Sequence, residues 1–308
     1  MRGKIVLLYE SDQGKALCNA ASRVLTQVAV TFGHPLTVPL RCCDQAEISD
    51  ELLDLCADAD AVLAGESGMA ALPALARELL CVCRVRELRY AHLIENRALM
   101  GQPLHSLLIQ ALDSSPEALQ AAASLAYKLS ARENLPIAQV PPTGKLAEGW
   151  KQAVEQADSL SAPFHARELA LAQVIPDIVY RPARIGILLC PPYAGGILAD
   201  AAAALCGAPS MDYDEYTGGQ CPVFAPLCLE KEAVSPFGML RAVHRLLRDK
   251  LGLEQEAACV EAAIRNVLQA GWRTPEIARP GAQMTDGTGI ADLICQQIEV
   301  AGEWIHNS

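Results

Sequence analysis

Short apolar segments alternate with segments of helical periodicity, and this alternation constrains the fold of the chain more than any other feature. The segments 4–9 (KIVLLY), 61–64 (AVLA) and 185–189 (IGILL) are short and strongly apolar, which is typical of buried strands. Strands that alternate with helices along a chain usually form a parallel sheet that helices cover on both faces. We therefore expect an α/β fold built on a doubly wound, mostly parallel sheet.

Local signals predict where several helices begin. The clearest start lies at Ser115, Pro116 and Glu117, because serine caps helices, proline fits the first turn and an acid suits the positive helix end. This helix is expected to reach Arg132, and Thr288 is expected to cap the last helix. The other helices are expected over residues 15–30, 49–57, 146–158, 197–205, 238–251, 253–270 and 289–300, with a further strand over 136–140.

Composition excludes several classes of protein. The net charge of −11 argues against a nucleic-acid partner, because binding phosphates requires a basic surface. No apolar run approaches the ~20 residues that a membrane helix needs. The residues from Met1 to Lys4 lead into a short strand and not into the long apolar region of a signal peptide. We expect a cytoplasmic protein that does not bind membranes.

The twelve cysteines are scattered along the chain, and several lie inside apolar runs. We interpret these as small buried hydrophobic side chains in a reducing compartment. The close pairs Cys42-Cys43 and Cys81-Val82-Cys83 do not match the spacing of a zinc site, so they predict no metal. The cysteines within apolar runs are Cys56, Cys190, Cys206, Cys259 and Cys295.

Several segments, in this order along nearly the whole chain, resemble the isocitrate/isopropylmalate dehydrogenases, a family of β-decarboxylating dehydrogenases. The segment 218–226 (GGQCPVFAP) is the strongest match, and the order of the segments supports the resemblance more than any one of them. This chain would be a divergent member. The other matching segments are 4–14, 59–68, 84–93, 148–151, 181–200, 274–276 and 288–289.

The resemblance implies a two-lobed fold with a cleft between the lobes. Residues 1–103 and 207–308 would form the first lobe, which holds both termini. Residues 104–206 would form the second, central lobe. The family also implies a homodimer in which the central lobes pack helix to helix.

Family members oxidise a 2-hydroxy acid with NAD or NADP and then release CO₂, using a divalent metal as a Lewis acid. The three aspartates that would bind the metal align with Ala172, Gly196 and Asp200, so only Asp200 could serve as a ligand. The catalytic lysine aligns with Val140, and the catalytic tyrosine falls in an apparent deletion between Ile109 and Ser115. We therefore expect no catalytic residue.

Ligand-binding positions are also depleted. Of the three substrate-binding arginines that the resemblance implies, Arg84 matches the first, while the others fall on Ile94 and near Gln110. Arg84 could bind an anion or be a solvated arginine on a helix surface. The adenosine loop aligns with 227–236, which lacks glycine and histidine. No cofactor is therefore expected, unless the family activity survives with NAD and Mg²⁺.

Three further features leave alternatives open. Gly195-Gly196 could bind a phosphate at a helix start or only permit a tight turn. The segment 211–216 (MDYDEY) could bind Ca²⁺ or a partner, or be a solvated loop, and His92 is either part of the Arg84 region or structural.

We predict a catalytically degenerate family member that serves as a binding, regulatory or structural subunit. An active relative could be its partner in a hetero-oligomer. One alternative is an enzyme with shifted chemistry, in which Arg84, Asp200 and Asp12 form a new site with a nearby cysteine or tyrosine. Another is an active NAD-dependent oxidoreductase acting on a 2-hydroxy acid such as 3-isopropylmalate.

Overall fold

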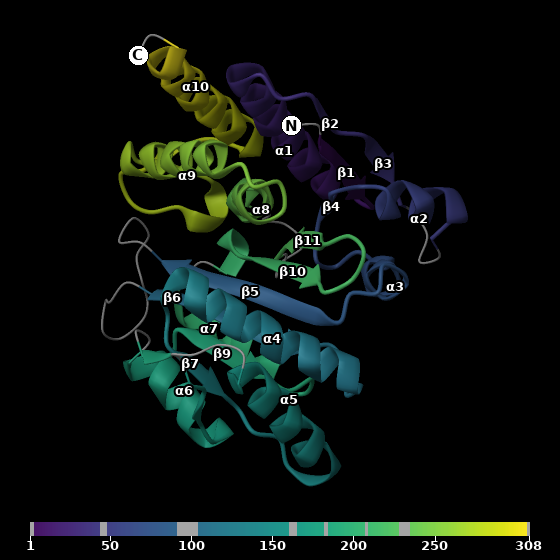
Figure 1. Ribbon diagram of the computed structural model, residues 1–308. Coiled ribbons are helices and arrows are strands. Elements are labelled where there is room, and N and C mark those ends of the chain that lie inside the picture. Colours follow the sequence, from purple (N-terminus) through teal and green to yellow (C-terminus); the bar gives the residue numbers. More distant parts are fainter. Residues whose placement is uncertain are drawn as a thin grey trace. The chain divides into compact units, whose positions relative to one another are not determined.

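The computed structural model describes residues 3–43, 48–90, 104–159, 165–181, 184–206, 209–227 and 235–306. The chain divides into two compact units (Figure 1). The first unit comprises Met1–Leu79, Ser210–Glu215 and Gln220–Ser308, and the second comprises Leu80–Pro209 and Tyr216–Gly219. The central unit thus begins at residue 80, whereas the sequence predicted residue 104.

The sheet of the first unit is centred on β1 (Gly3–Tyr9), which pairs in parallel with β2 (Leu36–Thr37), β3 (Leu40–Cys42) and β4 (Ala61–Ala64). Strand β11 (Val223–Pro226) pairs in parallel with β4, and β10 (Tyr213–Thr217) follows β11 in the order of strands. All four residues of β4 and of β11 are buried, which is typical of a parallel sheet covered on both faces.

Six helices surround this sheet within the described part of the first unit. Helix α1 packs against α8 and α10, and Figure 1 shows α8, α9 and α10 on the same side of the unit as α1. The helices are α1 (Asp12–Phe32), α2 (Asp50–Ala57), α3 (Leu72–Glu78), α8 (Pro236–Asp249), α9 (Glu254–Gln269) and α10 (Gly287–His306). A small parallel pair, β12 (Trp272–Arg273) with β13 (Gln283–Met284), completes the unit.

Capping residues mark both ends of helix α1, as local chemistry predicts. The Ser11 hydroxyl accepts a hydrogen bond from the Gly14 amide at the start of α1, and Gly33 ends the helix in the left-handed region with φ of 71°. The cap predicted at Thr288 is wrong. Helix α10 begins at Gly287, and the Asp286 carboxylate accepts from the Gly289 amide, because a residue capping a helix must precede its first turn.

The second unit contains a mixed sheet. Strand β5 (Cys83–Tyr90) pairs antiparallel with β6 (Leu104–Ala111) along its whole length. The remaining pairs are parallel, in the order β6, β9 (Ile187–Cys190), β7 (Ile137–Gln139) and β8 (Arg167–Glu168). Among these described pairs, β5 with β6 is antiparallel and the others are parallel.

Helices cover both faces of this sheet. One hydrophobic core lies between the sheet and α4 (Pro116–Glu133) with α5 (Ala147–Ser159). The other lies between the sheet and α6 (Leu171–Tyr180) with α7 (Gly195–Cys206). The prediction of an α/β fold with a doubly wound, mostly parallel sheet is confirmed.

The structure excludes two of the alternatives that the sequence left open. Arg84 lies on strand β5 and not on a helix surface. Residues 211–216 are not a solvated loop, because β10 begins at Tyr213 and the side chains of Asp212, Asp214 and Glu215 are buried.

The burial of the cysteines follows the prediction at several positions. Cys56 and Cys190 are fully buried, Cys259 and Cys295 are half-buried, and the side chain of Cys206 lies outside the described residues. Burial raises the pKa of the Cys56 thiol to about 12, so this thiol remains protonated at neutral pH.

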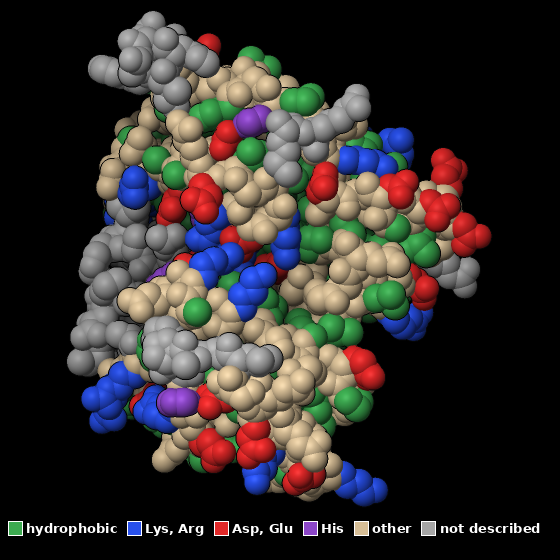
Figure 2. All heavy atoms as spheres, viewed as in Figure 1, with side chains coloured by type: hydrophobic (Ala, Val, Ile, Leu, Met, Phe, Trp, Pro, Cys, Tyr) green, Lys and Arg blue, Asp and Glu red, His purple; other side chains and the backbone are tan. Residues whose placement is uncertain are grey.

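Figure 2 shows acidic side chains gathered over α2, a helix that contains Asp50, Glu51 and Asp54.

Among the helices that the structure describes, none combines the length and apolar character needed to cross a membrane.

Candidate functional site

Arg84 and Gln110 meet side by side in the second unit. They are directly opposite each other in the antiparallel register of β5 and β6, so their side chains project from the same face. Arg84 Nη2 donates a hydrogen bond of 2.6 Å to Gln110 Oε1. The amide nitrogen of Gln110 donates to the backbone oxygen of Pro192, in the turn before α7. The Gln110 amide is therefore held at both ends.

The start of α7 packs directly against this pair, which explains the two glycines. A Cβ atom on Gly195 would lie 2.6 Å from Cβ and from Cγ of Gln110. A Cβ atom on Gly196 would lie 2.8 Å from Arg84 Nη2. Both distances are too short for real contacts, so the absence of side chains at 195 and 196 creates the space that Gln110 and Arg84 fill. This favours the packing interpretation of the glycine pair over a phosphate site.

Arg86 and Asp200 form the second polar contact on the same face. Arg86 lies two residues after Arg84 on β5, and side chains two residues apart on a strand point to the same side. Arg86 Nη1 lies 2.5 Å from Asp200 Oδ1 on α7. The Arg86 side chain is only 3% exposed, whereas the Asp200 side chain is 63% exposed. Asp200 thus neutralises a buried guanidinium from the outer side of a helix.

The other positions that the resemblance marks for metal binding and proton transfer contain no suitable group. Val140 is buried in the core beneath α6 and α7. Ala172 is exposed near the start of α6. Next to Val140, the Gln139 side chain is occupied as well, since Gln139 Oε1 accepts a 2.6 Å hydrogen bond from the Trp150 indole. None of these side chains could transfer a proton to or from a substrate.

These residues do not fit a Mg²⁺ ion. Mg²⁺ requires about six oxygen ligands in near-octahedral geometry, usually with one or two carboxylates. Here the one carboxylate is paired with Arg86, and position 196 faces the cationic Arg84. Within the described residues, no group of three or more His, Cys, Asp or Glu side chains is placed to hold a metal.

Asp12, the third predicted ligand-binding residue, belongs to the first unit. It is exposed at the first position of α1, directly after the Ser11 cap. Two other acids lie in the same region: Glu10 Oε2 accepts a 2.6 Å hydrogen bond from the Ala70 amide, and a Cβ on Gly14 would lie 3.4 Å from Glu66 Oε1. Asp12 is an acidic residue in the first turn of α1, where its negative charge stabilises the positive end of the helix dipole.

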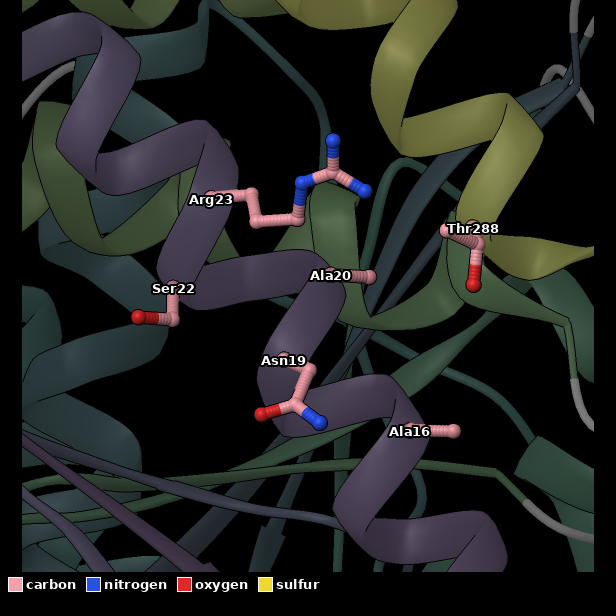
Figure 3. A pocket seen from close by; sticks show the side chains of 6 residues that line it. All are labelled: Ala16, Asn19, Ala20, Ser22, Arg23 and Thr288. Carbon is pink, nitrogen blue, oxygen red and sulfur yellow. The ribbon is translucent and has the colours of Figure 1, made fainter.

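Sequence reasoning missed a pair of adjoining cavities on α1. One, of about 480 Å³, is lined by α1 side chains and by Thr288 of α10 (Figure 3). The second, of about 310 Å³, extends past Gln13 towards Glu276 and Asp286. Both share Ala16 and Ala20, whose four-residue spacing on one helix face is the sequence signal that could have indicated a groove.

Sequence reasoning also missed a buried network of charges in the first unit. Arg241 Nη1 lies 2.9 Å from Asp212 Oδ1, and Arg245 Nε lies 3.3 Å from Glu215 Oε2. Lys250 Nζ lies 2.8 Å from the other Glu215 oxygen. These cations from α8 and the residue after it allow the acidic segment to be buried, which removes the basis for a calcium site there.

Some predicted features lie outside the described residues. They are His92, Ile94 and most of the segment aligned with the adenosine loop, residues 228–234.

Comparisons with known proteins agree with this fold and with the resemblance. The model of the isocitrate/isopropylmalate dehydrogenase family matches residues 117–293, which is more than half of the chain. A 3-isopropylmalate dehydrogenase from Moorella thermoacetica is 24% identical over 156 residues, an alignment that covers 49% of this chain but only 44% of the relative. The 3-isopropylmalate dehydrogenase of Halalkalibacterium halodurans is 24% identical over 98% of this chain and 99% of its own length.

A solved structure, isocitrate dehydrogenase from Methylococcus capsulatus, superposes with a TM-score of 0.82 at 15% identity, covering 96% of this chain and 99% of that one. At such low identity the superposition shows a shared fold. Together with the match to the family model, it leads to one conclusion: this chain belongs to the isocitrate/isopropylmalate dehydrogenase family.

Proposed function

We propose that this chain is a catalytically degenerate member of its family, which acts as a cytoplasmic binding, regulatory or structural subunit. One observation carries the proposal. Asp200, the only carboxylate at the three positions aligned with the metal ligands, forms an ion pair with the buried Arg86. The residue is thus used to stabilise the unit.

Energetics support this interpretation. To bind a metal, Asp200 would have to give up its ion pair with Arg86, whose side chain is 3% exposed. Removing one partner of a fully buried pair costs about 3–5 kcal/mol, and an exposed pair contributes at most ~1 kcal/mol. This half-exposed pair lies between those limits, and Ala172 and Gly196 contribute no metal ligand to offset the loss.

The absence of a proton-transfer group at position 140 also supports a catalytically degenerate protein. A positioned acid or base typically accelerates a reaction by about 10²–10⁴-fold. Val140 is a buried apolar residue where the resemblance implies the lysine. Without that group and without a metal, oxidation followed by loss of CO₂ would be too slow to serve a cell.

Ligand binding is the property that the remaining residues can support. Arg84 is a half-buried guanidinium with a fixed position on β5, and guanidinium groups bind carboxylates well. We propose a small carboxylate at Arg84 as the ligand. NAD and Mg²⁺ would be cofactors only if the family activity survives.

Self-association is proposed through the exposed apolar side chains of α6 and α7. Leu171 and Ile175 lie four residues apart on α6 and are each 44% exposed, and Ile197 on α7 is 70% exposed. Apolar side chains grouped on neighbouring helices are typical of a protein interface. A homodimer would cover them, and an active relative with the same fold could take the place of the second copy.

A dehydrogenase assay tests the central part of this proposal. The protein is mixed with NAD or NADP, Mg²⁺ or Mn²⁺, and either 3-isopropylmalate or isocitrate, while absorbance at 340 nm is recorded. The 3-isopropylmalate dehydrogenase of Halalkalibacterium halodurans serves as the positive control. We expect no NADH or NADPH above the blank, and turnover at a rate comparable to the control would refute the proposal.

Light scattering after size-exclusion chromatography tests the assembly. Ile197→Asp should convert a dimer to a monomer, because a carboxylate would be buried without a partner. Val30→Asp is the matched control, since Val30 is 74% exposed on α1 in the other unit. If neither variant changes the mass of a dimeric wild type, the α6–α7 interface is wrong.

A further inference from the structure

Gln110 occupies the position where a ligand of Arg84 would accept hydrogen bonds. Its Oε1 lies 2.6 Å from Arg84 Nη2, the distance expected for a charge-assisted hydrogen bond. Nη2 carries two N–H groups, and a carboxylate that binds the one facing Gln110 must displace the amide oxygen. The contact is intramolecular, so it forms without the loss of translational freedom that a free ligand incurs on binding.

The orientation of the amide is fixed by its surroundings. Oε1 faces a cation that only donates, and Nε2 faces the Pro192 oxygen, which only accepts. Turning the amide over would place a donor against a donor and an acceptor against an acceptor. The Gln110 stem also rests on Gly195, where even a methyl group would collide with it. Contacts with Arg84, Pro192 and Gly195 thus fix the conformation of the Gln110 side chain.

We propose that Gln110 is an internal latch on Arg84, and that small carboxylates compete with the Gln110 amide for Nη2 of Arg84. The inference rests on the proposed role of Arg84 as the ligand site. The latch raises the apparent Kd of the ligand. A carboxylate binds guanidinium more strongly than a neutral amide does, but it must compete with an amide that is always present beside Arg84.

Calorimetric titration with malonate at low ionic strength tests the latch. Gln110→Met keeps the length of the side chain but removes both polar atoms, so malonate should bind at least tenfold more tightly than to the wild type, which corresponds to about 1.4 kcal/mol. Gln110→Glu places a carboxylate beside Arg84 and should weaken binding below that of the wild type. The two variants therefore shift the affinity in opposite directions.

Two controls separate the latch from the site itself. Gln152→Met alters an exposed glutamine that also donates through Nε2, to Glu148, and should leave the affinity unchanged. Arg84→Met should abolish binding. If the wild type binds malonate and Gln110→Met binds it equally or more weakly, the latch is refuted while Arg84 remains the site. If Arg84→Met still binds, or if no variant binds at millimolar malonate, the proposed ligand site is itself refuted.

Discussion

Replacement of Asp200 with asparagine distinguishes a structural ion pair from a metal ligand. Asparagine keeps the size of the side chain and one acceptor oxygen but removes the charge that faces Arg86. At 2.5 Å, two unit charges attract by about 1.7 kcal/mol in a medium as polar as water, and by more in the interior. Because the Asp200 side chain is 63% exposed while Arg86 is buried, the pair lies near the water-like end of this range, and we expect a loss of about 1–2 kcal/mol.

For a chain of this length, that loss lowers the melting temperature by roughly 2–4 °C. Thermal unfolding is followed by circular dichroism in EDTA and again in excess Mg²⁺. The wild type and Asp200→Asn should differ by the same amount in both buffers. Asp292→Asn, which disrupts an ion pair with Arg23 in which both side chains are about half exposed, is the control and should cost at most ~1 kcal/mol. The reasoning is refuted if Asp200→Asn is neutral or stabilising without metal, or if Mg²⁺ stabilises the wild type alone.

Two further predictions concern packing and pH. Gly195→Ala should destabilise the second unit by about 1–3 kcal/mol, because its methyl group would lie 2.6 Å from Gln110 atoms. Gly149→Ala, at an exposed position of α5, is the control and should stabilise the protein by roughly 0.5–1 kcal/mol. Urea unfolding measures the free energy of both variants, and equal effects would contradict the packing at Gly195. Tyr127 donates a 2.8 Å hydrogen bond to Asp158, and this contact lowers the pKa of the Asp158 carboxyl below its usual range. A carboxyl whose pKa is lowered by folding stabilises the fold at pH values above the unfolded pKa of about 4, and this stabilisation is lost as the pH falls through the folded pKa. Tyr127→Phe should therefore be less stable than the wild type at pH 7. The difference in unfolding free energy between the two should narrow below about pH 4. A gap that stays constant down to pH 2 would contradict this linkage.

The helices and buried strands were predictable because their signals are local. The helix that follows Ser115 begins with a hydrogen bond from the Ala118 amide to the Ser115 hydroxyl, as the capping rule requires. Strand β4 and the strand at Ile187–Cys190 are continuous apolar runs, as expected for strands buried on both faces. These features depend on residues that are close together in the sequence.

Features that depend on distant residues could not be predicted in the same way. The acidic segment around Asp212 was interpreted as a loop because the cations that neutralise it, including Arg241, are about thirty residues away. A helix surface was one alternative for Arg84, although the alternating residues of 83–86 (CRVR) have the period of a strand, which was a usable signal.

Candidate site residues were predictable as positions but not as contacts. Matching to the family placed Arg84 and Asp200. Their actual partners, Gln110 and Arg86, depend on the register of β5 with β6 and on the packing of α7. Neither the register nor this packing can be inferred from the spacing of the residues in the sequence.

Binding of Mn²⁺ tests the loss of the metal site most directly. Free Mn²⁺ gives a strong paramagnetic resonance signal that disappears when the ion binds a protein, and the titration is made with 3-isopropylmalate or isocitrate present. We predict that the protein leaves the signal unchanged from buffer alone, whereas the Halalkalibacterium halodurans enzyme reduces it. Binding of one Mn²⁺ per chain that Asp200→Asn abolishes would contradict the account.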